Sequence, residues 1–111
     1  MNGTSFIYGC EPCRKRDSVP LKMSEIKGAL PNLKEWKYSP DFKAVSKEFH
    51  FDTYVEGVDF AVDVARISEN LNHHPQINIG YKWVSIEITT HTVGGLTHND
   101  FNLAANIDGI I

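Results

Sequence analysis

Four of the five histidines in this chain lie between Glu69 and Asp100, and two of them are adjacent in the sequence His73-His74-Pro75. Imidazole has an ordinary pKa of about 6.5, so it can both give and take a proton near neutrality. Neutral imidazole is also a common metal ligand. The spacing therefore raises two chemical questions: whether this stretch transfers protons, and whether it binds a metal ion.

The sequence favours proton transfer over metal binding. His73 and His74 would point apart in extended backbone, and the His-x-x-x-His spacing of a helical zinc site is absent. Cys10 and Cys13 form one Cys-x-x-Cys pair, but a structural zinc usually has four ligands and the sequence holds no second pair. We interpret these thiols as reduced or incidental, and leave open a metal shared with a distant histidine or a second subunit. We expect no metal site.

Composition and motifs argue against several other classes of protein. The net charge is -3, and basic residues cluster only in the run Arg14-Lys15-Arg16, so direct binding to nucleic acid is not expected. No apolar run approaches the roughly 20 residues of a membrane span, and the N-terminal residues lack the pattern of a signal peptide, so we expect a cytoplasmic protein without a membrane segment. The Gly-x-Ser-x-Gly motif typical of one class of Ser/His/Asp hydrolase is absent.

A long helix is expected to lead into the histidines. Thr53 and Glu56 have the form of a capping box, the signature of a helix N-terminus. Apolar residues then recur at helical spacing at Phe60, Val64, Ile67 and Leu71. Pro75 ends any helix before it, because the residue preceding a proline is pushed toward extended backbone. We therefore predict a helix over residues 53–72.

Alternating apolar and polar residues after this helix predict a β-hairpin with a two-residue turn at Tyr81-Lys82. In that register His91 lies opposite Asn72. It also lies diagonally from His73 and His74. Because neighbouring strands are about 4.8 Å apart, side chains at these positions are expected to line one pocket.

The positions of the other polar residues and histidines also predict their roles or their exposure. Glu69 precedes His73 by four residues and shares its helix face if the long helix extends that far, which would suit His73 to act as a proton donor. Asp100 is interpreted mainly as a helix-capping carboxylate. His98 is expected at the surface, and His50 is expected to point away from the apolar face of its strand.

Shorter patterns complete the fold. The further expected elements are a short helix capped by Ser24 and stopped by Pro31, strands near residues 36–39 and 45–51, and a terminal helix opened by a capping box at Thr97–Asp100. Residues 1–20 are expected to form a flexible arm, and residues 21–111 a single domain. The order α-β-β-α-β-β-α indicates an α+β fold, a four-stranded antiparallel sheet with helices packed on one face.

The spacing of the polar residues resembles the signature of a known family. The pattern is Glu69, three residues, His73-His74-Pro75, five residues, Tyr81, nine residues, His91, eight residues and Asp100. In this pattern the chain is similar to the pterin-4a-carbinolamine dehydratases, also known as dimerisation cofactors of a homeodomain transcription factor. The resemblance covers about residues 21–108, and the arm with the two cysteines lies outside it.

The resemblance implies an enzyme, a hydro-lyase that removes water from 4a-hydroxytetrahydrobiopterin. The product would be quinonoid dihydropterin, in the recycling of tetrahydrobiopterin for aromatic amino-acid hydroxylases. No metal or organic cofactor is implied. By family analogy His73 and His91 act around the 4a-hydroxyl as acid and base, with their order left open. The analogy also implies that His74 orients the pterin as a third catalytic-site histidine. The residues implied to bind substrate are Glu69, Pro75 and Asp100.

The resemblance also bears on partners. We expect a small-molecule pterin substrate, a homodimer or homotetramer, and an aromatic amino-acid hydroxylase in the same pathway. The alternative is a non-catalytic dimerisation or assembly module, or a transcriptional coactivator scaffold, of the same fold. A pure scaffold would be expected to lose the catalytic histidines, and this chain keeps all three, which favours catalysis.

Overall fold

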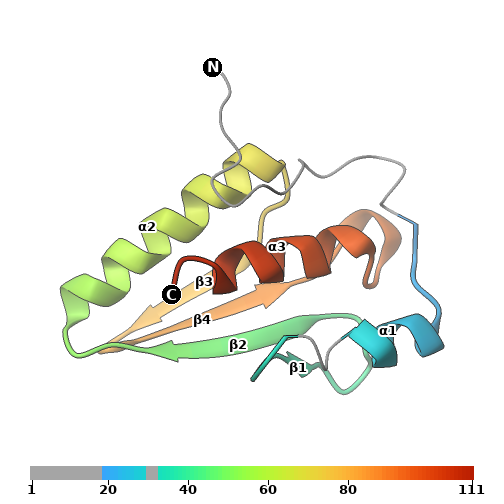
Figure 1. Ribbon diagram of the computed structural model, residues 1–111, viewed down its shortest axis with the longest axis horizontal. Helices are drawn as coiled ribbons and strands as arrows, with labels where there is room; N and C mark the ends of the chain where they lie inside the picture. The colour runs from blue at the N-terminus through green and yellow to red at the C-terminus, as the bar shows by residue number, and fades with distance from the viewer. Residues whose placement is uncertain (1–18, 30–32) are drawn as a thin grey trace.

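Within residues 19–29 and 33–111, which the structure describes, the computed structural model forms one four-stranded antiparallel sheet with helices on one face (Figure 1). In chain order the elements are α1 (Met23–Ala29), β1 (Lys37–Tyr38), β2 (Val45–His50), α2 (Tyr54–Leu71), β3 (Gln76–Gly80), β4 (Trp83–Ile88), the 3-10 helix η3 (His91–Val93) and α3 (His98–Asp108). This architecture confirms the α+β fold predicted from periodicity.

The strand order is β1-β2-β4-β3, so β4 lies inside the sheet and pairs on both sides. Gly80 pairs with Trp83 across the turn at Tyr81-Lys82, which confirms the predicted hairpin register. On its other edge β4 pairs with β2 from Val45 to His50. Because β4 is flanked by two strands and covered by helices, its inward side chains are removed from water, and the strand leads directly into the segment that carries His91.

Helices α2 and α3 lie side by side across the same face of the sheet (Figure 1). The hydroxyl of Thr53 accepts the backbone N–H of Glu56 at 3.2 Å, so the predicted N-cap is confirmed. The helix ends at Leu71, and Asn72 takes the left-handed conformation with φ 54°. Short polar residues such as Asn tolerate that conformation best after glycine, which explains an asparagine at this C-cap.

The core lies between the sheet and these two helices. Its fully or nearly fully buried apolar side chains include Val45, Phe49, Phe60, Val64, Ile67, Leu71, Val84, Ile86, Ile88, Leu103 and Ile107. Lys47 is the charged exception on the inward face of β2. Its ammonium lies 2.9 Å from Asp108 at the end of α3, and the indole N–H of Trp36 donates to the same carboxylate at 3.0 Å. The buried cation is therefore paired, and the pair links the sheet to α3.

Two local predictions are wrong. Helix α1 begins at Met23, so Ser24 lies in its first turn and does not cap it; the backbone N–H of Lys22 instead donates to the Glu25 carboxylate at 3.0 Å. Regular pairing of β4 ends at Ile88 and does not continue to His91. The predicted stop at Pro31 and the cysteine pair lie outside the described residues.

Candidate active site

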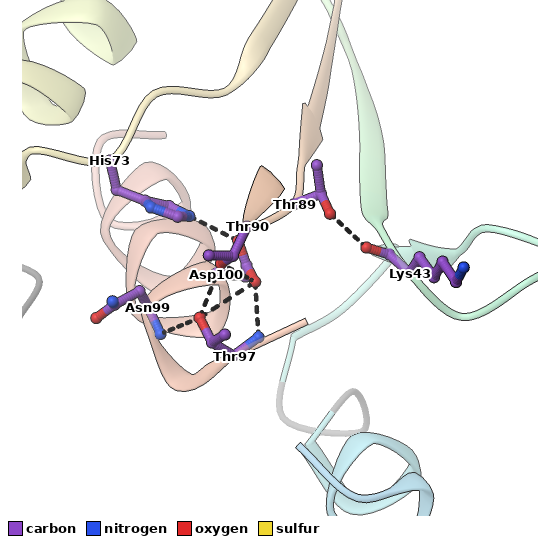
Figure 2. Close-up of polar contacts among 7 residues, drawn as sticks. All are labelled: Lys43, His73, Thr89, Thr90, Thr97, Asn99 and Asp100. Carbon is purple, nitrogen blue, oxygen red and sulfur yellow. Dashed lines mark hydrogen bonds and ion pairs between the residues drawn. The ribbon is translucent and has the colours of Figure 1, made fainter. Parts of the chain in front are cut away.

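His73 is placed by the turn that ends α2. Its backbone N–H donates to the carbonyl of Ser68 at 3.1 Å, directly after the left-handed Asn72. The ring then reaches the first turn of α3, where Nε2 lies 2.6 Å from Oδ1 of Asp100 (Figure 2). The His73 side chain is 12% exposed and that of Asp100 is fully buried. This is a short hydrogen bond to a carboxylate in a site that largely excludes water, where such bonds are strong.

Asp100 has a second role as a helix cap. Its Oδ2 accepts the backbone N–H of Thr97 at 2.7 Å and the hydroxyl of Thr90 at 2.8 Å. The Thr97 hydroxyl accepts the backbone N–H of Asn99 at 3.2 Å, and the predicted capping box is confirmed. The cap uses one carboxylate oxygen and His73 uses the other. Asp100 is therefore a helix cap, as predicted, and also contacts Thr90 and His73, which the prediction did not include.

Glu69 pairs with His74, and not with His73 as predicted. Oε1 of Glu69 lies 2.5 Å from Nε2 of His74, and the two side chains are 75% and 57% exposed. Helix α2 ends before His73, and the left-handed Asn72 removes the i,i+4 alignment on which the prediction depended. A pair this exposed contributes little to stability. Its effect is to orient the His74 ring at the surface, next in sequence to the largely buried His73 side chain.

His91 lies in η3 and is exposed, so it does not sit opposite Asn72 in a strand as predicted. Thr90 and Gly95 form an isolated bridge that turns the chain back before the predicted pairing can form. A different contact ties this segment to the others: Thr90, the residue before His91, donates to Asp100. The backbone that carries His91 is thus fixed to the same carboxylate that holds His73.

The remaining predicted residues behave more simply. Pro75 is half-buried in the extended link between His74 and β3. His98 and His50 are exposed, as predicted, and His50 lies 3.0 Å from the Glu48 carboxylate. A groove of about 460 Å³ lies over β1 and β2 and includes His50, but none of the predicted site residues lines it.

Within the described parts of the chain, no group of three or more His, Cys, Asp or Glu side chains is arranged to hold a metal ion. The same residues include no helix that is long and apolar enough to span a membrane.

The sequence analysis did not identify Thr90 as part of the site, although a signal was present. Thr90 occupies the inward position that follows Val84, Ile86 and Ile88 in the alternating pattern. A hydroxyl at a buried position needs a hydrogen-bond partner, so a threonine there indicates a polar group nearby. The partner is the Asp100 carboxylate, which comes from a different element.

Sequence comparisons identify the family of this chain. Residues 19–110 match the family model described as "Pterin 4 alpha carbinolamine dehydratase". A relative from Nitrosospira multiformis, named "Putative pterin-4-alpha-carbinolamine dehydratase", is 41% identical over 99 residues, which cover 89% of this chain and 85% of the relative. A protein of the same name from Legionella pneumophila is 35% identical over 103 residues, covering 92% of this chain and 90% of the relative.

Two solved structures are similar in fold. A protein described as a transcriptional coactivator/pterin dehydratase from Brucella melitensis has a TM-score of 0.78 and 28% identity, covering 83% of this chain and 98% of that one. A pterin dehydratase-like protein described as a RuBisCO assembly factor in the alpha-carboxysome has a TM-score of 0.58 and 28% identity, covering 68% of this chain and 88% of that one. Together with the family match over residues 19–110, these similarities show that the chain belongs to the pterin 4 alpha carbinolamine dehydratase family.

Proposed function

We propose that this protein is a 4a-hydroxytetrahydrobiopterin dehydratase, a hydro-lyase that removes water by histidine acid-base catalysis. Family membership supports the substrate class. The observation that carries the proposal is the 2.6 Å contact between His73 and the buried Asp100. A carboxylate that holds an imidazole in one orientation is a recurring arrangement for proton transfer, because the ring no longer has to be ordered during the reaction.

The reaction needs two proton movements and no external oxidant or reductant. One group delivers a proton to the 4a-hydroxyl oxygen, the carbon–oxygen bond breaks, and water leaves. A second group removes the proton from the neighbouring ring nitrogen, whose electron pair forms the new carbon–nitrogen double bond of the quinonoid dihydropterin. Each positioned imidazole supplies a rate gain of roughly 10²–10⁴ for such a transfer. No metal or organic cofactor is needed for these steps.

We also propose a division of roles among the candidate site residues. We assign proton transfer to His73 and His91, and orientation of the pterin to His74 together with Glu69, which pairs with it at 2.5 Å. We assign substrate binding to Pro75, which lies in the extended link between His74 and β3. In place of the substrate-binding role that the resemblance implies, we assign to Asp100 the positioning of His73, because its side chain is fully buried and its Oδ1 lies 2.6 Å from the His73 ring.

Stopped-flow measurement of carbinolamine dehydration tests the proposal. We expect the wild-type protein to exceed the buffer rate, and His73→Ala and His91→Ala each to lose about 100-fold or more in kcat. His98→Ala is the matched control, because this histidine is exposed in the first turn of α3 and has no assigned role. A wild-type rate equal to that of buffer, or a His73→Ala His91→Ala double variant with full activity, would refute the proposal.

A second candidate function is assembly or coactivation without catalysis. The printed descriptions of the two similar structures, a coactivator/pterin dehydratase and a RuBisCO assembly factor, favour it as an additional role. The three retained histidines argue against it as the only role. A purified partner that binds stoichiometrically, and still binds the triple His→Ala variant at positions 73, 74 and 91, would establish a separate binding function. Loss of binding in that variant would contradict it.

We also propose a homodimer or homotetramer. The outer face of α2 carries exposed apolar side chains, with Val55 64% and Val62 43% exposed. These residues are seven apart and therefore lie on one side of the helix. Burying this side against another copy would remove apolar surface from water. Analytical sedimentation should show an oligomer for the wild-type protein and a smaller species for Val62→Glu. A monomeric wild-type protein would refute the proposal.

A further inference from the structure

Both carboxylate oxygens of Asp100 accept hydrogen bonds, from Thr97 at the N-cap of α3, from Thr90 after β4 and from His73 after α2 (Figure 2). Oδ2 receives the Thr97 backbone N–H at 2.7 Å and the Thr90 hydroxyl at 2.8 Å, and the Thr97 hydroxyl lies at 3.4 Å. Oδ1 faces Nε2 of His73 at 2.6 Å. The carboxylate is fully buried, so these protein groups, and not bulk water, decide how it is oriented.

The hydroxyl hydrogens in this cluster can be assigned by counting. Each threonine hydroxyl has one hydrogen to donate. The Thr90 hydrogen points to Asp100 at 2.8 Å, so in the 2.9 Å contact between the two hydroxyls Thr97 donates and Thr90 accepts. The Thr97 oxygen in turn accepts the backbone N–H of Asn99 at 3.2 Å. The chain of donors therefore runs in one direction, from Asn99 through Thr97 and Thr90 to the carboxylate.

We infer that Thr90 and Thr97 are positioning residues of the active site, and that through Asp100 they fix His73 as the Nε2–H tautomer with Nδ1 as its reacting nitrogen. The Asp100 carboxylate has acceptor oxygens and no hydrogen to donate, so we assign the hydrogen in the 2.6 Å contact to the His73 ring. In the neutral ring the remaining nitrogen, Nδ1, then holds the lone pair that takes or returns a proton. This inference rests on the proposed dehydratase function for its catalytic part.

Thr90 has a further consequence for His91. The two residues are adjacent in the chain, and the bridge between Thr90 and Gly95 fixes the backbone at this point. The Thr90 hydroxyl also binds Asp100, so it ties the segment that carries His91 to the same carboxylate. Removing it should disturb both proposed proton-transfer groups, although Thr90 itself is buried and is not placed to touch substrate.

The experiment compares Thr90→Val, Thr90→Ser and Thr89→Val with the wild-type protein. Valine keeps the shape of threonine and removes the hydroxyl, whereas serine restores it. Thr89→Val is the matched control, because the neighbouring Thr89 hydroxyl donates at 2.5 Å to the backbone carbonyl of Lys43, away from the cluster (Figure 2). Nitrogen-15 NMR of the histidine rings, with the His73 signals assigned from a His73→Gln variant, reads the tautomer without any substrate.

We expect His73 of the wild-type protein to be the Nε2–H tautomer. Thr90→Val should make its ring nitrogens exchange between tautomers and lower kcat by about 10–100-fold, with a much smaller change in KM. Thr90→Ser should restore both readouts, and Thr89→Val should change neither. Thr90→Val removes the hydrogen bonds to Asp100 and Thr97, and Thr89→Val removes the bond to Lys43. An unchanged tautomer in Thr89→Val and its recovery in Thr90→Ser would separate a positioning role from the loss of a threonine hydroxyl alone.

Two results would overturn the inference. One is a wild-type His73 with its hydrogen on Nδ1, a measurement that needs no variant to fold. The other is a folded Thr90→Val protein with an unchanged tautomer and unchanged kcat. If the wild-type protein shows the expected tautomer but no dehydration above the buffer rate, the proposed function fails while the positioning of His73 stands. The NMR and kinetic readouts therefore distinguish the two failures.

Discussion

Substitution of Asp100 by asparagine gives the sharpest test of how the buried carboxylate works. The amide has the same size, and its oxygen can replace Oδ2 as acceptor for the Thr97 N–H at 2.7 Å and the Thr90 hydroxyl at 2.8 Å. Its NH2 group must then face Nε2 of His73, where two donors would meet. His73 must either move its hydrogen to Nδ1 or turn away from the site.

The structural cost of this change is modest and the catalytic cost is large. Replacing one buried, charge-assisted hydrogen bond by a neutral or broken one costs about 1–3 kcal/mol. A domain of this size is stable by about 5–15 kcal/mol, so Asp100→Asn should remain folded, with Tm lower by about 10 °C. Loss of a correctly oriented imidazole should lower kcat by about 10²–10⁴.

The assay combines stopped-flow dehydration kinetics with thermal unfolding of the same samples. Asp108→Asn is the matched control: it makes the same chemical change at the other end of α3, where the carboxylate accepts from Trp36 and Lys47. That variant should lose stability but keep its kcat. The reasoning is refuted if Asp100→Asn retains kcat within about threefold of wild type, or if Asp108→Asn loses as much activity as Asp100→Asn.

Three further outcomes are expected. Asn72→Val should lower the free energy of unfolding by about 1–2 kcal/mol in urea titrations, because a β-branched residue is strained at φ 54°, whereas Asn72→Gly should not. Gly80→Ala should cost about 1–3 kcal/mol and alter tryptophan fluorescence, because the added Cβ would lie 2.0 Å from the ring of Trp83; unchanged fluorescence would contradict the packing. If one imidazole gives a proton and another takes one, kcat should fall on both sides of an optimum between pH 5 and 9, and a flat profile would count against the mechanism.

Much of the fold could be predicted because its signals are local. The helix from Thr53 to Asn72 follows from a capping box, a 3.6-residue apolar repeat and the proline at position 75, all within one continuous stretch. The β3–β4 register follows from a two-residue turn, since the side-chain period of two leaves no alternative once one face is buried. The start of α1 was mispredicted because the helix is short and a serine near its start resembles a cap. The backbone N–H of Lys22 is instead bound by the Glu25 carboxylate.

The candidate site residues were named from the sequence, and the structure corrected how several of them pair. Glu69, His73, His74, His91 and Asp100 were all named from their types and spacing, and the family match over residues 19–110 agrees with the pattern that named them. Their partners depend on where the chain turns. Because Asn72 has a left-handed backbone conformation, Glu69 contacts His74 where His73 was predicted. Because Thr90 pairs with Gly95, His91 lies outside the sheet.

The sequence by itself determined most of the helices and strands, and which residue types are available for the proposed proton transfer, because helix caps, periodicity and imidazole chemistry are properties of short stretches. Only the tertiary structure decided that Asp100, 27 residues from His73, is the carboxylate that holds it, and that Thr90 orients that carboxylate. Contacts of this kind depend on the packing of α3 against the end of β4 and on the exclusion of water from a fully buried carboxylate. Neither this packing nor this exclusion of water can be predicted from the spacing of residues in the sequence, since both depend on where separate elements meet.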